Sequence, residues 1–300
     1  MQPPPLPGFL APLFPFRRAV HVLQSGPDAG RRIHLIDEGD PAGRPVFMLH
    51  GNPTWSFLWR QVIALLPGFR CVAPDLLGLG LSDRLPRLAD HTVDRHGAAM
   101  AEVVEALDLR GVILVGQDWG GPIAAQVGAR MPERIAGLVL ANTAVTVPAH
   151  PKGTLFHRFA RVPGVSDLVF RGLGFPQNVL WAIQGDKGSI RGEVARAYRW
   201  PLRTWRDRIA PLALARMVPS GPDHPSLPAL RQGAGWVVSF RGPSALVWGM
   251  RDPVFQPVFL EQWLELFPEA EVVRVESAAH YVPEDEPSAV VEALRGWPAG

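Results

Sequence analysis

Cysteine, lysine and tyrosine are scarce in this 300-residue chain, and long hydrophobic runs are absent. Cys71 is the one cysteine, so the chain forms no internal disulfide and no thiolate metal cluster, which predicts a reducing, cytoplasmic setting. No apolar run approaches the ~18 residues of a membrane span. The apolar N-terminal segment is broken by prolines and has no basic leader, so we expect neither a signal peptide nor a membrane partner.

The charge balance excludes a second class of partner. Lys+Arg total 30 against 28 Asp+Glu, a net charge of +2, and only Lys152 and Lys187 are lysines. The arginines stand mostly singly among acids and prolines, and no basic stripe follows a phosphate backbone, so we expect no nucleic-acid partner. Hydrophobic residues make up 47% and charged residues 19% of the chain, a balance typical of a folded globular protein.

Short apolar runs alternate with helical patterns in both outer parts of the chain, which predicts crossover units and a mainly parallel sheet flanked by helices. The middle third is rich in proline, glycine and aromatic residues and carries only short helical patterns, which indicates an inserted helical cap. We therefore predict an α/β fold with core residues 1–146 and 233–300 and a cap at 147–232. The expected strands are 45–50, 71–74, 111–115, 135–141, 244–248 and 271–275; the expected helices are 55–66, 92–107, 121–130, 257–267 and 287–294, with 192–198 and 205–217 in the cap.

The sharpest motif joins the strand at 111–115 to the helix at 121–130. It reads Gly-Gln-Asp-Trp-Gly-Gly and places Asp118 at the centre of a small-x-nucleophile-x-small elbow. The glycines permit a tight turn that projects the central side chain from the carboxyl edge of the sheet. Asp118 is also a suitable N-cap for the following helix, and the motif alone does not separate the two roles.

Three further segments follow predicted strands. They are His50-Gly51-Asn52-Pro53, Trp248-Gly249-Met250-Arg251-Asp252 and Ala279-His280-Tyr281-Val282-Pro283-Glu284. The order nucleophile, acid, histidine is the order of a triad on an α/β-hydrolase sheet. Taken singly, Asp252 can cap the turn before Pro253 and His280 can be an ordinary loop residue, but four coincident placements favour a catalytic site.

The motifs as a set resemble those of the haloalkane dehalogenases, a family of the α/β-hydrolase superfamily. The matching stretches are HGNPTWSFLWR (50–60), PDLLGLGLSD (74–83), GQDWGGPIA (116–124), WGMRDPVF (248–255) and HYVPEDEP (280–287). The resemblance extends from about residue 15 to residue 295, with the cap its least certain part.

This resemblance implies hydrolysis of haloalkanes to alcohol and halide. Asp118, anionic at neutral pH, displaces the halide and becomes an alkyl ester; His280, oriented by Asp252, then activates water against that ester. The backbone N–H groups of Asn52 and Trp119 cradle the oxyanion, and their side chains bind the halide. The partners are a small apolar halogenated substrate, water and halide.

The resemblance implies no cofactor and no metal, and the remaining histidines show no metal-site spacing. Some members carry the triad acid after the strand at 135–141; here residues 141–145 contain no acid, so Asp252 takes that role. Trp181 or Trp205 of the cap is an alternative or additional halide donor.

Other functions remain open. Epoxide hydrolases share the aspartate nucleophile but use a pair of cap tyrosines; this chain has only Tyr198 and Tyr281, and Tyr281 stands beside the histidine. A serine esterase is disfavoured because Asp118 occupies the elbow. A non-catalytic ligand-binding protein on this fold has no need of the complete set of Asp118, Asp252 and His280.

Overall fold

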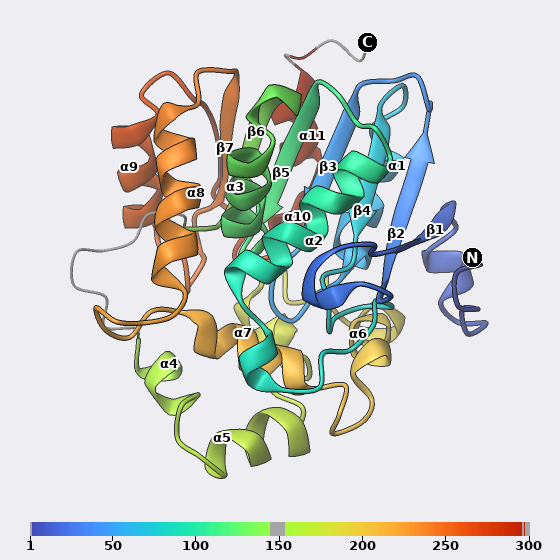
Figure 1. Ribbon diagram of the computed structural model, residues 1–300, viewed down its shortest axis with the longest axis vertical. Helices are drawn as coiled ribbons and strands as arrows, with labels where there is room; N and C mark the ends of the chain where they lie inside the picture. The colour runs from blue at the N-terminus through green and yellow to red at the C-terminus, as the bar shows by residue number, and fades with distance from the viewer. Residues whose placement is uncertain (1, 145–153, 296, 298–300) are drawn as a thin grey trace.

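The computed structural model describes residues 2–144, 154–295 and 297, and eight strands in this part of the chain form one sheet (Figure 1). Their order is β1-β2-β4-β3-β5-β6-β7-β8. β2 runs antiparallel to both of its neighbours, and all other pairs are parallel. The strands are β1 (Arg18–Val22), β2 (Arg32–Gly39), β3 (Pro45–Leu49), β4 (Arg70–Pro74), β5 (Val112–Gln117), β6 (Ile135–Ala141), β7 (Ser244–Gly249) and β8 (Glu271–Val275).

Helices cover both faces of the sheet, and this explains why the central strands are almost continuously apolar. Every residue of β3 and β5 is buried, as expected of parallel strands that lie between two helical layers. In Figure 1, α2, α3 and α8 lie on the near face, and α3 packs against both others; α1 and α11 pack together on the far face. The core helices are α1 (Arg60–Ala64), α2 (Val93–Ala106), α3 (Gly120–Arg130), α8 (Leu227–Ser239), α9 (Pro257–Leu266), α10 (Val282–Asp285) and α11 (Pro287–Arg295).

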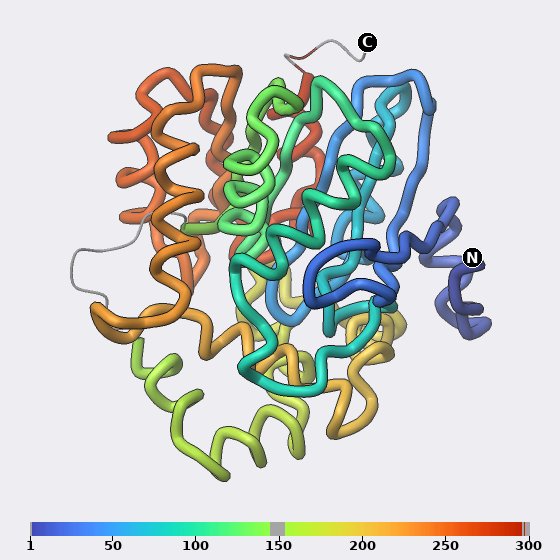
Figure 2. The backbone as a smooth tube through the Cα atoms, viewed as in Figure 1, coloured from blue at the N-terminus to red at the C-terminus, as the bar shows by residue number. Residues whose placement is uncertain are grey.

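A group of shorter helices lies beyond the carboxyl ends of the parallel strands and forms the cap, at the lower end of the molecule in Figures 1 and 2. They are α4 (Leu155–Phe159), α5 (Val165–Asp167), α6 (Gly192–Arg199) and α7 (Ile209–Met217). The predicted start of the cap, between residues 146 and 147, lies outside the described residues. The predicted end, between 232 and 233, falls inside α8. Because α8 packs along α3 of the core, an end of the cap before Leu227 fits the packing better.

The predicted α/β fold with a mainly parallel sheet is confirmed, and the differences within it have local causes. The predicted helix 55–66 begins as a 3₁₀ turn at Ser56–Trp59, because the buried carboxylate of Asp75 accepts the Ser56 N–H at 2.7 Å. The predicted cap helix 205–217 begins only at Ile209, since the Asp207 carboxylate closes a turn on Thr204. β1, β2, α8 and the short helices α4, α5 and α10 were not predicted. None of the helices in the described segments combines the length and apolar character needed to cross a bilayer.

Candidate active site

Asp118 occupies a sharp turn between β5 and α3. Its φ of +51° lies in the left-handed region, which is costly for a residue other than glycine and persists only where the surroundings enforce it. The flanking glycines are required by contact: a Cβ at Gly120 would lie 1.9 Å from the carbonyl oxygen of Leu49, and one at Gly116 would lie 2.6 Å from that of Gly120. The elbow predicted from the sequence is therefore a tightly packed element that presents the Asp118 carboxylate at the carboxyl edge of the sheet.

Backbone N–H groups surround the carboxylate of Asp118. The Asn52 N–H donates to Oδ1 at 2.7 Å, and the Trp119 N–H provides a second backbone hydrogen bond. Burial raises the pKa of Asp118 above its ordinary value, while the charge of His280 and the two N–H donors oppose that rise. These donors come from the loop after β3 and from the beginning of α3, which are the two positions expected of an oxyanion hole.

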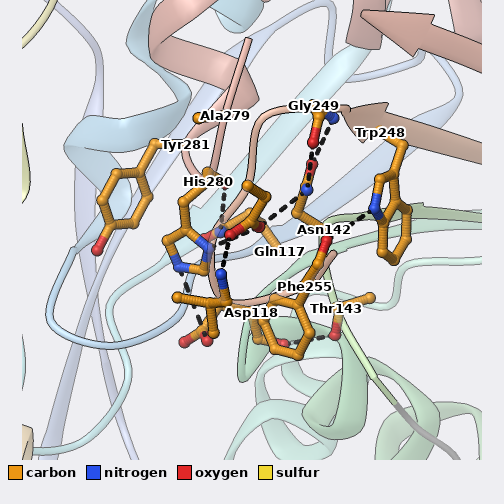
Figure 3. Close-up of polar contacts among 12 residues, drawn as sticks. Gln117, Asp118, Asn142, Thr143, Trp248, Gly249, Phe255, Ala279, His280 and Tyr281 are labelled. Carbon is orange, nitrogen blue, oxygen red and sulfur yellow. Dashed lines mark hydrogen bonds and ion pairs between the residues drawn. The ribbon is translucent and has the colours of Figure 1, made fainter. Parts of the chain in front are cut away.

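His280 and Asp252 form a buried pair, and Figure 3 shows His280 beside Asp118 of the elbow. His280 Nδ1 lies 2.9 Å from Asp252 Oδ2, and His280 Nε2 lies 4.0 Å from Asp118 Oδ2. Burial lowers the pKa of His280, but the carboxylates of Asp252 and Asp118 outweigh burial and hold that pKa above its ordinary value. One imidazole nitrogen is thus tied to a carboxylate while the other faces Asp118, as a general base requires.

Asp252 is fixed by more than the histidine. Its Oδ2 also accepts from the Asn142 side-chain amide at 2.9 Å, and its Oδ1 accepts from the Val254 N–H at 2.7 Å. Asn142 follows β6, where the sequence offers no acid. The absence of an acid at this position pointed to Asp252, but nothing in the sequence indicated that Asn142 donates to that carboxylate.

The two residues expected to bind halide both lie beside Asp118. The Asn52 side-chain amide donates to the carbonyl of Pro211 in α7 at 3.0 Å, which leaves its second amide hydrogen available. Trp119 is 8% exposed, and among the described residues its indole N–H has no hydrogen-bond partner. Trp181 and Trp205 are both more than 40% exposed, with arginines stacked on their rings. Because Trp181 and Trp205 are solvent-exposed, the more buried Asn52 and Trp119 are favoured as the halide donors.

Tyr198, the one cap tyrosine, lies in a buried network with Arg60 and Glu284. Its hydroxyl donates to the Glu284 carboxylate, which also forms an ion pair with Arg60. Burial and the Glu284 charge raise the pKa of Tyr198 well above its ordinary value. Tyr281 lies closer to Asp118: its ring packs edge-on against His280, and its hydroxyl lies 3.4 Å from the Asn52 carbonyl oxygen.

The other titratable groups in the described part of the chain offer no alternative centre. In the segments that the structure describes, no three His, Cys, Asp or Glu side chains are arranged to hold a metal ion. His91 and His96 form a buried pair with ring nitrogens 3.2 Å apart, and burial lowers the pKa of His96 to about 4. Buried His34 is bonded to Asp75 beneath the loop after β4. These histidines support the fold, whereas the nucleophile, its N–H donors and the His280–Asp252 pair all lie at the Asp118 elbow.

Comparison with known proteins places this chain in a family. A family model described as the alpha/beta hydrolase fold matches residues 44–287. The chain is 36% identical to haloalkane dehalogenase 2 of Mycobacterium tuberculosis over 261 residues. This match covers 83% of this chain and 86% of the relative. The chain is 31% identical over 256 residues to a cis-3-alkyl-4-alkyloxetan-2-one decarboxylase of Shewanella oneidensis, covering 84% of this chain and 80% of that protein. The structure of a tetrameric haloalkane dehalogenase from Paraglaciecola agarilytica superimposes with a TM-score of 0.81 at 26% identity, covering 95% of this chain and 94% of that one.

Proposed function

Since the chain belongs to the α/β-hydrolase fold family and to its haloalkane dehalogenase group, we propose that it hydrolyses carbon–halogen bonds through an alkyl ester on Asp118. The observation that supports this proposal most strongly is the position of Asp118 between two backbone N–H donors and a His280–Asp252 pair. A hydrolase that activated a serine would have no use for a carboxylate here.

The first step is displacement of halide. Asp118 Oδ1 is held by the Asn52 N–H, while Oδ2 faces His280 across 4.0 Å. Oδ2 attacks the halogen-bearing carbon, the new carbon–oxygen bond forms as the carbon–halogen bond breaks, and the halide leaves with the electron pair. The second side-chain amide hydrogen of Asn52 and the indole N–H of Trp119 bind the departing anion, since a halide in a dry pocket needs donors.

The second step is hydrolysis of the ester. His280 Nε2 takes a proton from water, and the water oxygen adds to the carbonyl carbon of the Asp118 ester. The negative charge that develops on the carbonyl oxygen is met by the N–H groups of Asn52 and Trp119, a contribution worth about 3 kcal/mol per donor. The tetrahedral intermediate then expels the alkoxide, which takes the proton from His280 and leaves as the alcohol. The carboxylic acid that remains on Asp118 loses its proton to water, which restores the carboxylate for the next turnover. Asp252 stabilises the imidazolium between these transfers.

The position of Tyr198 weighs against an epoxide hydrolase. Opening an epoxide requires an acid that protonates the ring oxygen, and the one cap tyrosine donates instead to buried Glu284. The relative named as an oxetanone decarboxylase gives a second candidate substrate class, because a carboxylate nucleophile can open a strained four-membered lactone without a halide leaving group. We also retain the cytoplasm as the expected compartment. Burial raises the pKa of the Cys71 thiol to about 12, and the buried thiol stays reduced there.

The variant His280→Phe tests the proposal. Asp118 attacks without a base, so this variant should release about one equivalent of bromide from 1-bromobutane and then stop, with a butyl adduct on the peptide that contains Asp118. Mass spectrometry after exposure to 1-bromobutane, an alkyl epoxide or a dialkyl oxetan-2-one separates the substrate classes. An adduct from the epoxide or the oxetanone but none from the bromide would refute dehalogenation, as would no adduct from any of the three.

A further inference from the structure

The loop that carries His280 is bound to a segment of the cap, residues 183–189. The Ala279 N–H donates to Asp285 at 3.0 Å, the His280 N–H to the carbonyl of Ile183 at 3.1 Å, and the Tyr281 N–H to Oε1 of Gln184 at 3.1 Å. Three consecutive N–H groups around the catalytic imidazole therefore have defined partners. Two of these partners belong to the cap segment, and the third, Asp285, is bonded to it.

The Asp285 carboxylate joins the cap segment to the His280 loop. Its Oδ2 accepts from the Ala279 N–H and from the Gly185 N–H at 2.8 Å. Its Oδ1 accepts from the Gln184 side-chain amide at 3.0 Å, the Asp186 N–H at 3.2 Å and the Ser189 hydroxyl at 3.0 Å. Hydrogen bonds to an ionised acceptor are stronger than neutral ones, so one carboxylate with five donors fixes both segments together.

The two backbones also touch directly. A Cβ at Gly185 would lie 1.9 Å from the carbonyl oxygen of Ser277 and 2.8 Å from Cα of Ala278. Only glycine permits this approach. On the core side, the side-chain amide of Gln117 donates to the carbonyl of His280 at 3.0 Å. The catalytic loop is thus held between the core and the cap segment.

We propose that Asp285 and Gln184 are positioning residues through which the cap segment 183–189 keeps the His280 imidazole in line with the Asp118 ester. The expected effect on ester hydrolysis rests on the proposed function. Asp118 takes its own hydrogen bonds from Asn52, Trp119 and Thr143, all in the core. Loss of the Asp285 contacts therefore slows ester hydrolysis and leaves the displacement of halide nearly unchanged.

The kinetic test is a rapid-quench experiment with 1-bromobutane on Asp285→Asn. The asparagine keeps the shape of the side chain but removes the charge and turns an NH₂ group toward backbone donors. We expect the rate of the bromide burst to stay within about twofold of the unmodified protein, the steady-state rate to fall at least tenfold, and butyl-Asp118 to accumulate. Gly185→Ala, which changes no charge but separates the two backbones, should give the same pattern and serves if Asp285→Asn does not fold.

Asp207→Asn is the matched control, because the Asp207 carboxylate, like that of Asp285, joins the cap to the core, but it does so through Arg84 rather than near His280. It should leave both the burst and the steady state unchanged. An equal loss of burst and steady state in Asp285→Asn, or the same slowing of hydrolysis in Asp207→Asn, would overturn the proposal, since either shows a general loosening of the cap.

A second readout does not depend on turnover. Hydrogen exchange at the Ala279, His280 and Tyr281 amides should speed up in Asp285→Asn and stay slow in Asp207→Asn. If the protein released no bromide but these amides responded as expected, the proposed function would fall while the link between cap and histidine stood. Unchanged exchange in Asp285→Asn would remove the link itself.

Discussion

The Asn142 side-chain amide donates to Asp252 Oδ2 at 2.9 Å, the same oxygen that His280 Nδ1 contacts at the same distance. Asn142 is itself fixed, because its Oδ1 accepts from the Gly249 N–H at 2.8 Å. The ends of β6 and β7 are thereby joined around the triad acid. The Asn142 amide is neutral, whereas a second carboxylate at this position would repel Asp252. The amide also orients the Asp252 carboxylate toward His280.

We therefore expect Asn142→Gly to impair the hydrolytic step. Asn142 has a φ of +35°, and glycine keeps this conformation accessible while deleting the amide. A hydrogen bond to a buried charge contributes about 1.5–3 kcal/mol, so ester hydrolysis should slow by roughly tenfold or more, with the bromide burst retained. Rapid-quench kinetics with 1-bromobutane measure both phases. A steady-state rate equal to that of the unmodified protein would show that Asp252 needs no support from Asn142.

Trp119→Phe should weaken halide binding. The substitution deletes the indole N–H, which has no partner among the described residues, and keeps most of the aromatic volume in the core. The loss of one hydrogen bond to an anion, about 1.5–3 kcal/mol, should raise the inhibition constant for bromide by at least about tenfold with little change in melting temperature. Product inhibition and thermal unfolding provide the two measurements. If bromide inhibits both proteins equally, Trp119 is not a halide ligand.

The convergence of Asp118, Asp252 and His280 could be predicted from the sequence because of the sheet. Each follows a run of apolar residues that reads as a strand, and the carboxyl ends of parallel strands meet at one edge. The structure places the last two beside Asp118 although they lie more than 130 residues away in the chain. Sequence spacing and the chemistry of the residues were sufficient for this part of the site.

The supporting contacts could not be predicted in the same way. Tyr198 was identified as a cap tyrosine, but only packing shows that its hydroxyl points to Glu284. Asp285 was part of a matching motif, yet its role depends on the path of cap residues 183–189, a segment with no periodic pattern. Edge strand β1 was missed because its five residues are only half-buried, so it has a weaker hydrophobic pattern than β3 or β5.

Tyr198→Phe separates a structural tyrosine from a catalytic one. Removal of the hydroxyl leaves Glu284 with Arg60 and Gln61 as side-chain partners, so the free energy of unfolding should fall by about 1–3 kcal/mol. Turnover of 1-bromobutane should stay within about twofold. Urea denaturation and steady-state kinetics test both statements. Complete loss of turnover in a variant that remains folded would place Tyr198 in the reaction and reopen the epoxide hydrolase hypothesis.

The last prediction concerns the pKa of His280, which changes during the catalytic cycle. In the free enzyme burial lowers this pKa, and the charges of Asp252 and Asp118 together raise it above its ordinary value. Ester formation neutralises Asp118, so one of the two raising charges disappears at the moment when a neutral imidazole is needed. The pKa of His280 must therefore fall when the ester forms, which favours the base form of the imidazole.

Asp118→Asn reproduces the loss of that charge in a stable protein. We expect the His280 ring to titrate at lower pH in Asp118→Asn than in the unmodified protein, as followed by NMR, because only Asp252 still opposes the effect of burial. In the unmodified protein, fold stability and the rate of ester hydrolysis depend on pH in opposite directions. The raised pKa of His280 stabilises the fold below the ordinary pKa of about 6.5, and that stabilisation is lost as pH rises through the folded-state pKa, whereas ester hydrolysis speeds up as the imidazole loses its proton. A His280 titration at the same or higher pH in Asp118→Asn would show that Asp118 does not influence the base across the 4.0 Å gap.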